Sequence, residues 1–349
     1  MAAYTTIDDP EAYFQTQLYT GNGSANNAIT LGGDTDMQPD LVWIKNRDAT
    51  DSHCLFDAVR GATKLLDSAE NTAESTDTDT LDSFASDGFQ VDADVKVNTD
   101  AEKYVAWCWK AGGSTSSNTT GDITSTVSVN STSKFSIVSY TGNGSANQTV
   151  GHSVGVKPDL VIIKNRERAA LWAVINPRFA STSNTNMLYL DSTAAEADDT
   201  NIQGDNAHSS TIFGVDNWAG VNTNTETQIA YCWASVQGFS KFGTYEGNGD
   251  ADGTFVYTGF RPAFVMTKSV DSTSAWHMFD NKREGYNKDN DPLVADDTTV
   301  EATTDMIDLL SNGFKFRIAT DPNVAETYVY AAWAEAPFVN SEGVPCNAR

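Results

Sequence analysis

The sequence has 349 residues, of which 40% are hydrophobic and 10% aromatic, a content typical of folded chains that bury ordinary cores. Lys and Arg number 22 against 47 Asp and Glu, so the net charge is −25 at pH 7. Because nucleic acids and anionic membranes are bound mainly through Lys and Arg, this balance excludes both as expected partners.

Cysteine usage and the N-terminal sequence indicate where the protein is made. The four cysteines lie far apart without a C-x-x-C pair, which argues against a disulfide framework and against a zinc site. The first residues lack the basic start and apolar core of a signal peptide, and no apolar run approaches the roughly 18 residues that span a bilayer. We therefore expect synthesis in a cytoplasm and no insertion into a membrane.

Three landmarks recur along the chain in the same order. The first is a tyrosine followed closely by Gly-Asn-Gly, at residues 19–23, 140–144 and 245–249. The second is a proline followed by an apolar run, at 39–45, 158–164 and 262–268. The third is an aromatic-rich run, at 104–109, 228–233 and 328–333. The pattern predicts three tandem repeats, each the size of a small domain.

The apolar runs are expected to be β-strands. They are short, rich in β-branched and aromatic residues, and bounded by Gly, Asn, Asp and Ser. In the third landmark of the first repeat, Val105, Trp107 and Trp109 alternate with the small residues Ala106 and Cys108. Alternate residues of a strand share a face, so both faces are suited to burial between two packed sheets. We predict an all-β fold of tandem antiparallel β-sandwich domains.

Composition divides the predicted fold into four parts. Residues 1–110 are expected to form an N-terminal segment and the first sandwich, 134–236 the second and 237–349 the third. Residues 111–133, almost wholly Gly, Ser, Thr and Asn with a few β-branched residues, are predicted to form a flexible or extended connector. Within the first domain, residues 58–74 are predicted to form one short helix.

Residue patterns of catalysis are weak. The sequence contains no H-E-x-x-H pair and no G-x-x-x-x-G-K loop, and its four histidines never have metal-ligand spacing. His53 precedes Cys54, but neighbouring residues of a strand point to opposite faces, which argues against a thiol–imidazole pair. We therefore expect a protein that is not an enzyme.

An Asp followed three residues later by an Arg occurs twice, at Asp57/Arg60 and Asp280/Arg283. The spacing favours a local ion pair that fixes a turn. A sugar-binding or catalytic carboxylate is the alternative, because enzymes that cleave polysaccharides use two carboxyl groups about 5–10 Å apart.

The third Gly-Asn-Gly turn has two interpretations. Asn248, Asp250 and Asp252 supply oxygen atoms at the first, third and fifth positions of a loop with Gly253 at the sixth, as in the first half of a calcium loop. Gly259 stands where such a loop has its bidentate Glu. The same residues also form ordinary β-turns. Ca²⁺ bound by Asn248, Asp250 and Asp252 is thus the one cofactor that the sequence suggests.

Tryptophans in polar surroundings are candidates for glycan contact, because an indole ring stacks on the apolar face of a sugar while Asp and Asn bind its hydroxyls. Trp172, Trp218 and Trp276 lie in or near such stretches. The alternative is that these rings fill the cores of the sandwiches, and Trp218 is the best surface candidate of the three.

Several motifs resemble a repeat family of structural proteins from marine tailed bacteriophages. The resemblance is carried by the three Tyr-x-Gly-Asn-Gly starts and by residues 6–16, 39–47, 59–64, 86–89, 104–113 and 334–339. It covers nearly the whole chain, although the second repeat lacks recognisable counterparts of residues 59–64 and 86–89.

The resemblance implies a virion structural protein, tail-fibre-like, with jelly-roll or concanavalin-like β-sandwiches, assembled in the host cytoplasm. It carries over no functional residues. We expect a tail fibre or tail appendage that contacts the host surface; the alternatives are a capsid decoration or head-fibre protein, an enzyme that degrades envelope polysaccharide, and a stand-alone lectin. Expected partners are other virion proteins, further copies of the chain and a host surface glycan.

Overall fold

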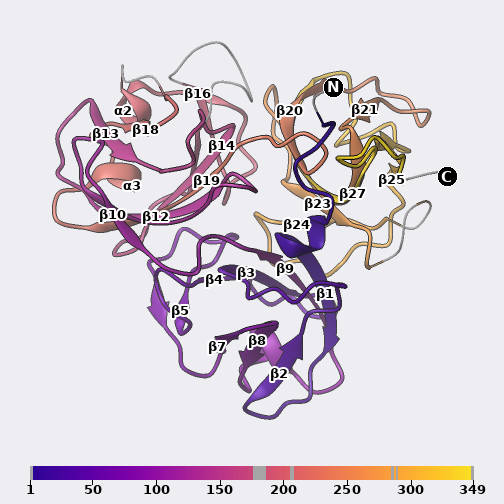
Figure 1. Ribbon diagram of the computed structural model, residues 1–349, viewed down its shortest axis with the longest axis horizontal. Coiled ribbons are helices and arrows are strands. Elements are labelled where there is room, and N and C mark those ends of the chain that lie inside the picture. The colour runs from indigo at the N-terminus through magenta and orange to yellow at the C-terminus, as the bar shows by residue number, and fades with distance from the viewer. Residues whose placement is uncertain (1–2, 176–185, 205–207, 284–286, 288–289, 347–349) are drawn as a thin grey trace.

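Antiparallel β-sheets make up most of the regular secondary structure of this protein (Figure 1). The computed structural model describes residues 3–175, 186–204, 208–283, 287 and 290–346. Every ladder between named strands is antiparallel. The helices are single turns: η1 (Pro10–Ala12), α1 (Val95–Asn98), α2 (Thr200–Gln203) and α3 (Ala219–Asn222). The prediction of a mostly β chain is confirmed. In the described part of the chain, no helix has the length and apolarity to cross a membrane.

The first segment of the chain, residues 3–110, builds a four-stranded and a three-stranded sheet. The larger sheet has the order β1 (Phe14–Thr20), β9 (Lys103–Trp109), β3 (Leu41–Asn46), β4 (Cys54–Asp57). The smaller has the order β2 (Asn27–Thr30), β8 (Gly88–Val91), β7 (Leu81–Ala85). A two-stranded ladder joins β5 (Lys64–Leu65) and β6 (Ser75–Thr76).

The second segment, residues 111–236, builds the largest sheet. Its order is β10 (Ser116–Asn118), β11 (Ser125–Asn130), β12 (Phe135–Thr141), β19 (Thr227–Trp233), β14 (Leu160–Asn165), β15 (Ala173–Ile175), β16 (Asn186–Tyr189), β17 (Ala197–Asp198). A two-stranded sheet pairs β13 (Gln148–Gly151) with β18 (Ile212–Val215).

The third segment, residues 237–346, has a five-stranded and a three-stranded sheet. The larger has the order β20 (Ser240–Glu246), β27 (Thr327–Pro337), β22 (Phe260–Ser269), β23 (His277–Asp280), β24 (Leu293–Val294). The smaller has the order β21 (Phe255–Tyr257), β26 (Gly313–Phe316), β25 (Ile307–Leu310).

Each aromatic-rich strand lies inside its sheet and is buried on both faces. On β9, the side chains of Val105, Trp107 and Trp109 join an apolar cluster that all three segments share. The alternate residues, which include Ala106 and Cys108, join a cluster of the first segment alone. Strands β19 and β27 divide their side chains in the same way between the shared cluster and a cluster of their own segment. Each of the three large sheets is therefore covered by apolar side chains on both faces.

Three tryptophans meet in the shared cluster. The ring centroids of Trp109 and Trp233 lie 6.2 Å apart, those of Trp109 and Trp333 5.3 Å, and those of Trp233 and Trp333 5.8 Å. Figure 1 shows the three segments as lobes around a common centre, the first at the bottom, the second at upper left and the third at upper right. The last strands of the three segments thus meet through their tryptophans, and each ring packs against rings of the other two segments.

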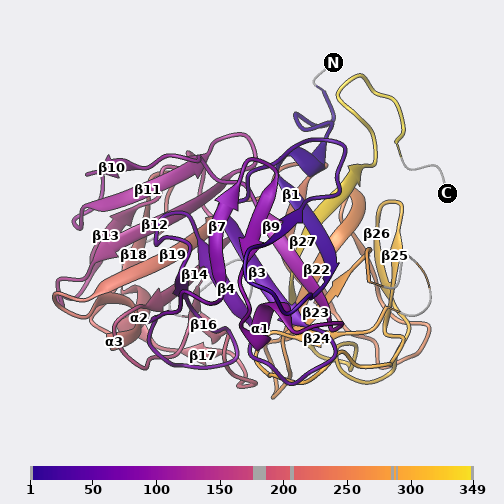
Figure 2. The same ribbon diagram turned by 90° about the horizontal axis from the view of Figure 1, so that it is seen from below.

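The two ends of the molecule differ (Figure 2). The N-terminal residues and the residues that follow β27 lie at one end of the molecule, whereas α1, α2 and α3 lie at the other. The N-terminal residues contact the third segment, because the backbone N–H of Ser341 donates to the carboxylate of Asp8 at 2.6 Å.

The helix predicted over residues 58–74 is wrong. The carboxylate of Asp57 accepts the backbone N–H groups of Val59 and Arg60 at 3.0 and 2.8 Å, which turns the chain directly after β4. Residues 64–65 then form β5. A short polar side chain at the strand end competes here with the helical backbone hydrogen bonds.

The predicted connector, residues 111–133, is extended and ordered into strands. Its residues form β10 and the whole of β11, and β11 pairs along its whole length with β12. The β-branched residues in this stretch include Val127, which is buried at 1% exposure. Burial of a few such side chains is enough to fix a Ser- and Thr-rich stretch onto a sheet edge.

Shortening one central tryptophan should destabilise the whole molecule. We expect Trp233→Ala to lower the free energy of unfolding by about 3–5 kcal/mol, because a large buried ring leaves a cavity. Phe255→Ala is the control, since that ring is 44% exposed. Urea titrations followed by circular dichroism measure both. Equal midpoints for the two variants would contradict the central role of the indoles.

Candidate functional site

Each Gly-Asn-Gly turn is fastened by one buried asparagine. In the first segment, the side-chain oxygen of Asn98 accepts the backbone N–H of Asn22 at 2.9 Å. Its amide nitrogen donates to the carbonyl of Ser24 at 2.8 Å and to the side-chain oxygen of Asn22 at 3.2 Å. Asn98 is fully buried at the last position of α1. One side chain therefore satisfies both ends of the turn.

The same contacts recur in the other segments. The oxygen of Asn222 accepts the N–H of Asn143 at 2.9 Å, and its amide donates to the carbonyl of Ser145 at 2.8 Å. The oxygen of Asn323 accepts the N–H of Asn248 at 3.3 Å, and its amide donates to the carbonyl of Asp250 at 2.9 Å. The three asparagines were missed in the sequence, although Val-Asn-Thr-x-x-Glu at 97–102 and 221–226 is a signal for two of them.

Removing one of these asparagines should loosen its turn. We expect Asn222→Ala to cost about 1–3 kcal/mol, because the variant leaves the N–H of Asn143 without its buried acceptor. Asn224→Ala is the matched control, since Asn224 is exposed two residues away. Thermal unfolding compares the two. A loss in Asn222→Ala no greater than in Asn224→Ala would refute the fastening role.

The side chains of the predicted calcium ligands contact other groups of the protein. The oxygen of Asn248 accepts the N–H of Asp250 at 3.0 Å, and a carboxylate oxygen of Asp250 accepts the N–H of Asp252 at 2.8 Å. The carboxylate of Asp252 lies 2.6 Å from the ammonium of Lys315, whose hydrogen bond lowers the pKa of Asp252. Among the described residues, no group of three His, Cys, Asp or Glu side chains gathers as a metal site would need. The geometry fits the turn interpretation rather than the calcium interpretation.

Calcium should not change the stability of the protein. We expect the same melting temperature in millimolar CaCl₂, in MgCl₂ and in EDTA, because the turn oxygens already have partners. Differential scanning fluorimetry measures this directly. A rise specific to CaCl₂ that disappears in Asp252→Asn would restore the calcium interpretation.

Two of the three candidate glycan tryptophans have no exposed ring. Trp172 is 0% and Trp276 is 2% exposed, so the glycan interpretation is wrong for both: no ring face reaches a sugar. Their indole N–H groups donate at 2.8 Å to the carbonyls of Asp67 and Tyr189, each in the preceding segment. Trp218 is half-buried, with its ring 6.1 Å from that of Tyr189, and its contact with a glycan stays a prediction.

The histidines are part of the interior. His53 accepts the indole N–H of Trp43 through Nδ1 at 2.8 Å, so its proton resides on Nε2, which lies 2.9 Å from the carbonyl of Val294. Burial lowers the pKa of His53 to about 3 and raises that of the neighbouring Cys54 thiol. Both groups are neutral at pH 7, which removes the thiol–imidazole pair from consideration.

One catalytic pattern was missed in the sequence. Residues 151–155 read Gly-His-Ser-Val-Gly, the spacing of a nucleophile elbow, and Ser153 has a positive φ of 60°. The strand–turn–helix context of an elbow is absent, because β13 ends at Gly151 and no helix of the described chain follows before α2. The hydroxyl of Ser153 accepts the amide of Asn118 at 2.9 Å, while Nδ1 of His152 accepts the N–H of Val154 at 3.1 Å. His152 is therefore not a base for Ser153.

The two Asp/Arg pairs belong to buried charge chains between segments. Arg60 contacts Asp57 and also lies 3.1 Å from Glu74, whose other oxygen contacts Arg166 of the second segment at 2.8 Å. The hydroxyl of Tyr231 donates to Asp57 at 2.8 Å. The alternative of an accessible sugar-binding carboxylate is excluded at Asp57, which is fully buried.

The third segment holds the corresponding chain. Arg283 contacts Asp280 at 2.7 Å and Glu301 at 2.6 Å, and Glu301 contacts Arg47 of the first segment at 2.7 Å. The indole N–H of Trp107 donates to Asp280 at 3.2 Å. Both Asp/Arg pairs thus fix a turn, as expected, and each also joins two segments.

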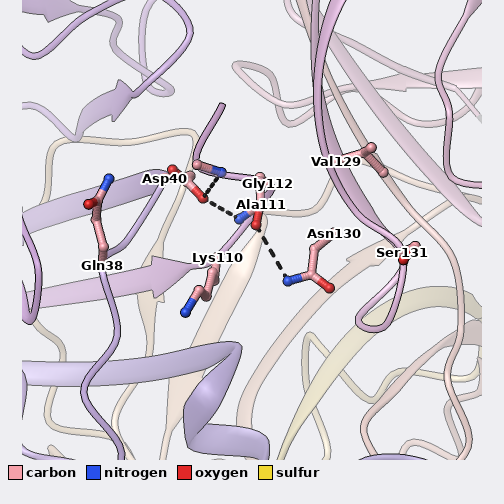
Figure 3. A pocket seen from close by; sticks show the side chains of 9 residues that line it. Gln38, Asp40, Lys110, Ala111, Gly112, Val129, Asn130 and Ser131 are labelled. Carbon is pink, nitrogen blue, oxygen red and sulfur yellow. Dashed lines mark hydrogen bonds between the residues drawn. The ribbon is translucent and has the colours of Figure 1, made fainter. Parts of the chain in front are cut away.

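A polar cavity of about 500 Å³ lies where the first segment leads into the second (Figure 3). One carboxylate oxygen of Asp40 accepts the backbone N–H groups of Ala111 and Gly113 at 2.7 and 3.2 Å, and Asn130 donates to the carbonyl of Ala111 at 3.4 Å. Lys110 supplies a cation to the lining. Burial raises the pKa of Asp40 in spite of these hydrogen bonds. The carboxyl group of Asp40 thus fixes the backbone directly after β9.

Comparison with known proteins identifies a family without an assigned function. A family model described as "Domain of unknown function (DUF7483)" matches residues 9–337. The chain belongs to this family. No curated protein and no solved structure matches it.

The match to DUF7483 runs across all three segments. It includes the three central tryptophans, the three fastening asparagines and both charge chains. The family model therefore treats the three segments as one domain, and the apolar cluster that they share packs them together.

Proposed function

We propose that the chain consists of three tandem copies of one antiparallel β-sandwich. The strand orders β1-β9-β3-β4, β12-β19-β14-β15 and β20-β27-β22-β23 support this. Each order begins with the strand that carries the tyrosine before the Gly-Asn-Gly turn, continues with the last strand of the segment and ends with two middle strands. The smaller sheets β2-β8-β7, β13-β18 and β21-β26-β25 correspond in the same manner. The asparagine fastenings occupy equivalent places in all three.

The copies close into a ring about a pseudo-threefold axis. Three hydrogen bonds between backbones support the ring, from Glu74 to the carbonyl of Arg166 at 2.8 Å, from Glu196 to Val270 at 2.9 Å, and from Glu301 to Arg47 at 3.1 Å. Each segment donates once and accepts once. Head-to-tail contacts of this kind form a closed ring when the rotation between copies is one third of a turn.

A second cycle of contacts runs in the opposite direction. The residues directly before β4, β15 and β23 are His53, Trp172 and Trp276, and each ring nitrogen lies 2.8–2.9 Å from a carbonyl of the preceding segment in the ring. Two cycles make the three copies mutually dependent. The chain is thus equivalent to a homotrimer whose subunits are covalently joined.

We infer from this closed ring that the protein is a structural protein of a bacteriophage particle, a tail fibre or tail appendage that contacts the host surface. The charged and aromatic side chains of this protein hold its three segments together as one body. Such a body suits a component of a particle, which packs against other virion proteins and contacts the host surface. The resemblance of several motifs to a repeat family of tailed-phage structural proteins supports the same role. A catalytic role is not proposed.

Immunogold labelling of particles tests this function. Antiserum raised against the recombinant chain should label the tails of particles of the phage that encodes it, and pre-immune serum provides the control. Label confined to the head would overturn the tail assignment in favour of a capsid decoration or head fibre. Particles without label, from lysates in which the protein is detected, would overturn the virion role.

A further inference from the structure

Two large aromatic side chains are exposed side by side on the third segment. Phe255 is 44% and Tyr257 is 48% exposed, and both belong to β21. Val256 between them is buried at 6%, so the two rings share the outward face of the strand. Aromatic rings are otherwise concentrated in the clusters of this protein, which makes their exposure here informative.

A cavity of about 390 Å³ adjoins one of these rings. Its lining includes Tyr4 from the N-terminal residues, Ser235 and Gln237 from the turn after β19, and Tyr257 and Thr258 from the end of β21. This volume lies within the range of about 300–1,000 Å³ that small-ligand sites have. Phe255 does not contribute to the lining.

The aromatic groups of the cavity are held in place by the protein itself. The hydroxyl of Tyr4 donates to the carbonyl of Gly259 at 2.9 Å and lies 3.3 Å from the hydroxyl of Tyr257. Burial, together with the neighbouring Tyr257, raises the pKa of Tyr4 to about 12, so this hydroxyl keeps its proton. Rings fixed before binding lose little conformational freedom when a ligand arrives.

The side chains that line the cavity carry little charge, although the protein as a whole is strongly acidic. The chain carries a net charge of −25, yet none of the described residues that line the cavity has a carboxylate. Lys241, a cation of the lining, donates to the carbonyl of Tyr257 at 2.6 Å, and its ammonium lies 5.3 Å from the centre of the Tyr257 ring. The cation is thus engaged with the protein, and the cavity favours an uncharged ligand.

Pyranose sugars have the matching chemistry. The face of an aromatic ring is electron-rich and attracts the C–H groups on the apolar face of a sugar. The hydroxyl groups of the sugar would pair with the hydroxyls and the amide of the lining. An apolar peptide in the same place would displace water from these polar groups without forming hydrogen bonds to them, which costs free energy.

We propose that the cleft formed by Tyr4, Gln237 and Tyr257 binds an uncharged pyranose unit of a surface glycan. The source of that glycan, the host surface, rests on the function proposed above. The site itself rests on the exposed ring, the cavity and its polar lining, whose cation Lys241 is bound to the protein.

Isothermal titration calorimetry on the full chain tests the site. The probes are neutral mono- and disaccharides of glucose, galactose, mannose and N-acetylglucosamine, with glucuronic acid and an apolar hexapeptide for comparison. At least one neutral saccharide should bind. Tyr257→Ala should weaken that binding at least tenfold, whereas Tyr257→Phe, which keeps the ring, should bind within about threefold of the natural chain, a change worth under about 1 kcal/mol.

Phe255→Ala is the matched control, because Phe255 shares the strand and the exposure of Tyr257 but lies outside the cavity. It should bind as the natural chain does, and all variants should keep its melting temperature. Binding of glucuronic acid or the peptide alone, no binding of any neutral saccharide at 10 mM, or equal affinity in Tyr257→Ala would overturn the site. Tail labelling without sugar binding would leave the proposed function standing, and sugar binding without particle labelling would leave the site standing.

Discussion

The packing of three indole rings against one another is the constraint on which this molecule depends. Trp109, Trp233 and Trp333 are contributed by strands far apart in the sequence, and each touches the other two. Every segment has a second apolar cluster of its own on the opposite face of its large sheet. A segment alone would therefore hide one face of its sheet and expose the other. Since buried aromatic area is the main source of packing free energy, the three segments are expected to unfold together rather than one by one.

The chain has only 22 Lys and Arg residues, and several of them are buried. Lys45 of β3, Lys164 of β14 and Lys268 of β22 are buried, and burial lowers the pKa of each to about 8. Lys164 donates to the carbonyl of Asn71 at 2.8 Å, and Lys268 to that of Thr193 at 2.8 Å, so both reach into the preceding segment. A buried cation adds little net stability, but it penalises every arrangement that leaves it unpaired. We regard these lysines as determinants of how the segments are aligned.

The sequence was informative where the signal is local and poor where burial comes from a distant part of the chain. Alternation of Val105, Trp107 and Trp109 predicted a strand suited to burial on both faces, and β9 has this form. The burial of Trp172 depends on the carbonyl of Asp67, which is distant in sequence, so its polar neighbours were misleading. The fastening asparagines have the same origin, because each binds a turn about 75 residues earlier in the chain. The sequence does not show which face of β21 is buried. The exposure of Phe255 and Tyr257 follows only from the structure, in which Val256 between them points into the interior.

The joints of the proposed ring are chemically unequal, and acid should act on them in opposite directions. Burial would raise the pKa of Glu74, but its hydrogen bonds to Arg166 and Arg60 outweigh this and lower it. Its ionised form stabilises the joint between the first and second segments above the unfolded pKa, and this contribution is lost as the pH falls through the folded pKa. The equivalent Glu196, at the joint between the second and third segments, has its pKa raised by burial, so proton uptake favours the folded form there. Val270 stands at that joint where Arg166 and Arg47 stand at the others. Acid that protonates Glu74 therefore weakens the joint between the first and second segments, whereas proton uptake by Glu196 favours the joint between the second and third, although the same kind of backbone hydrogen bond occurs at all three.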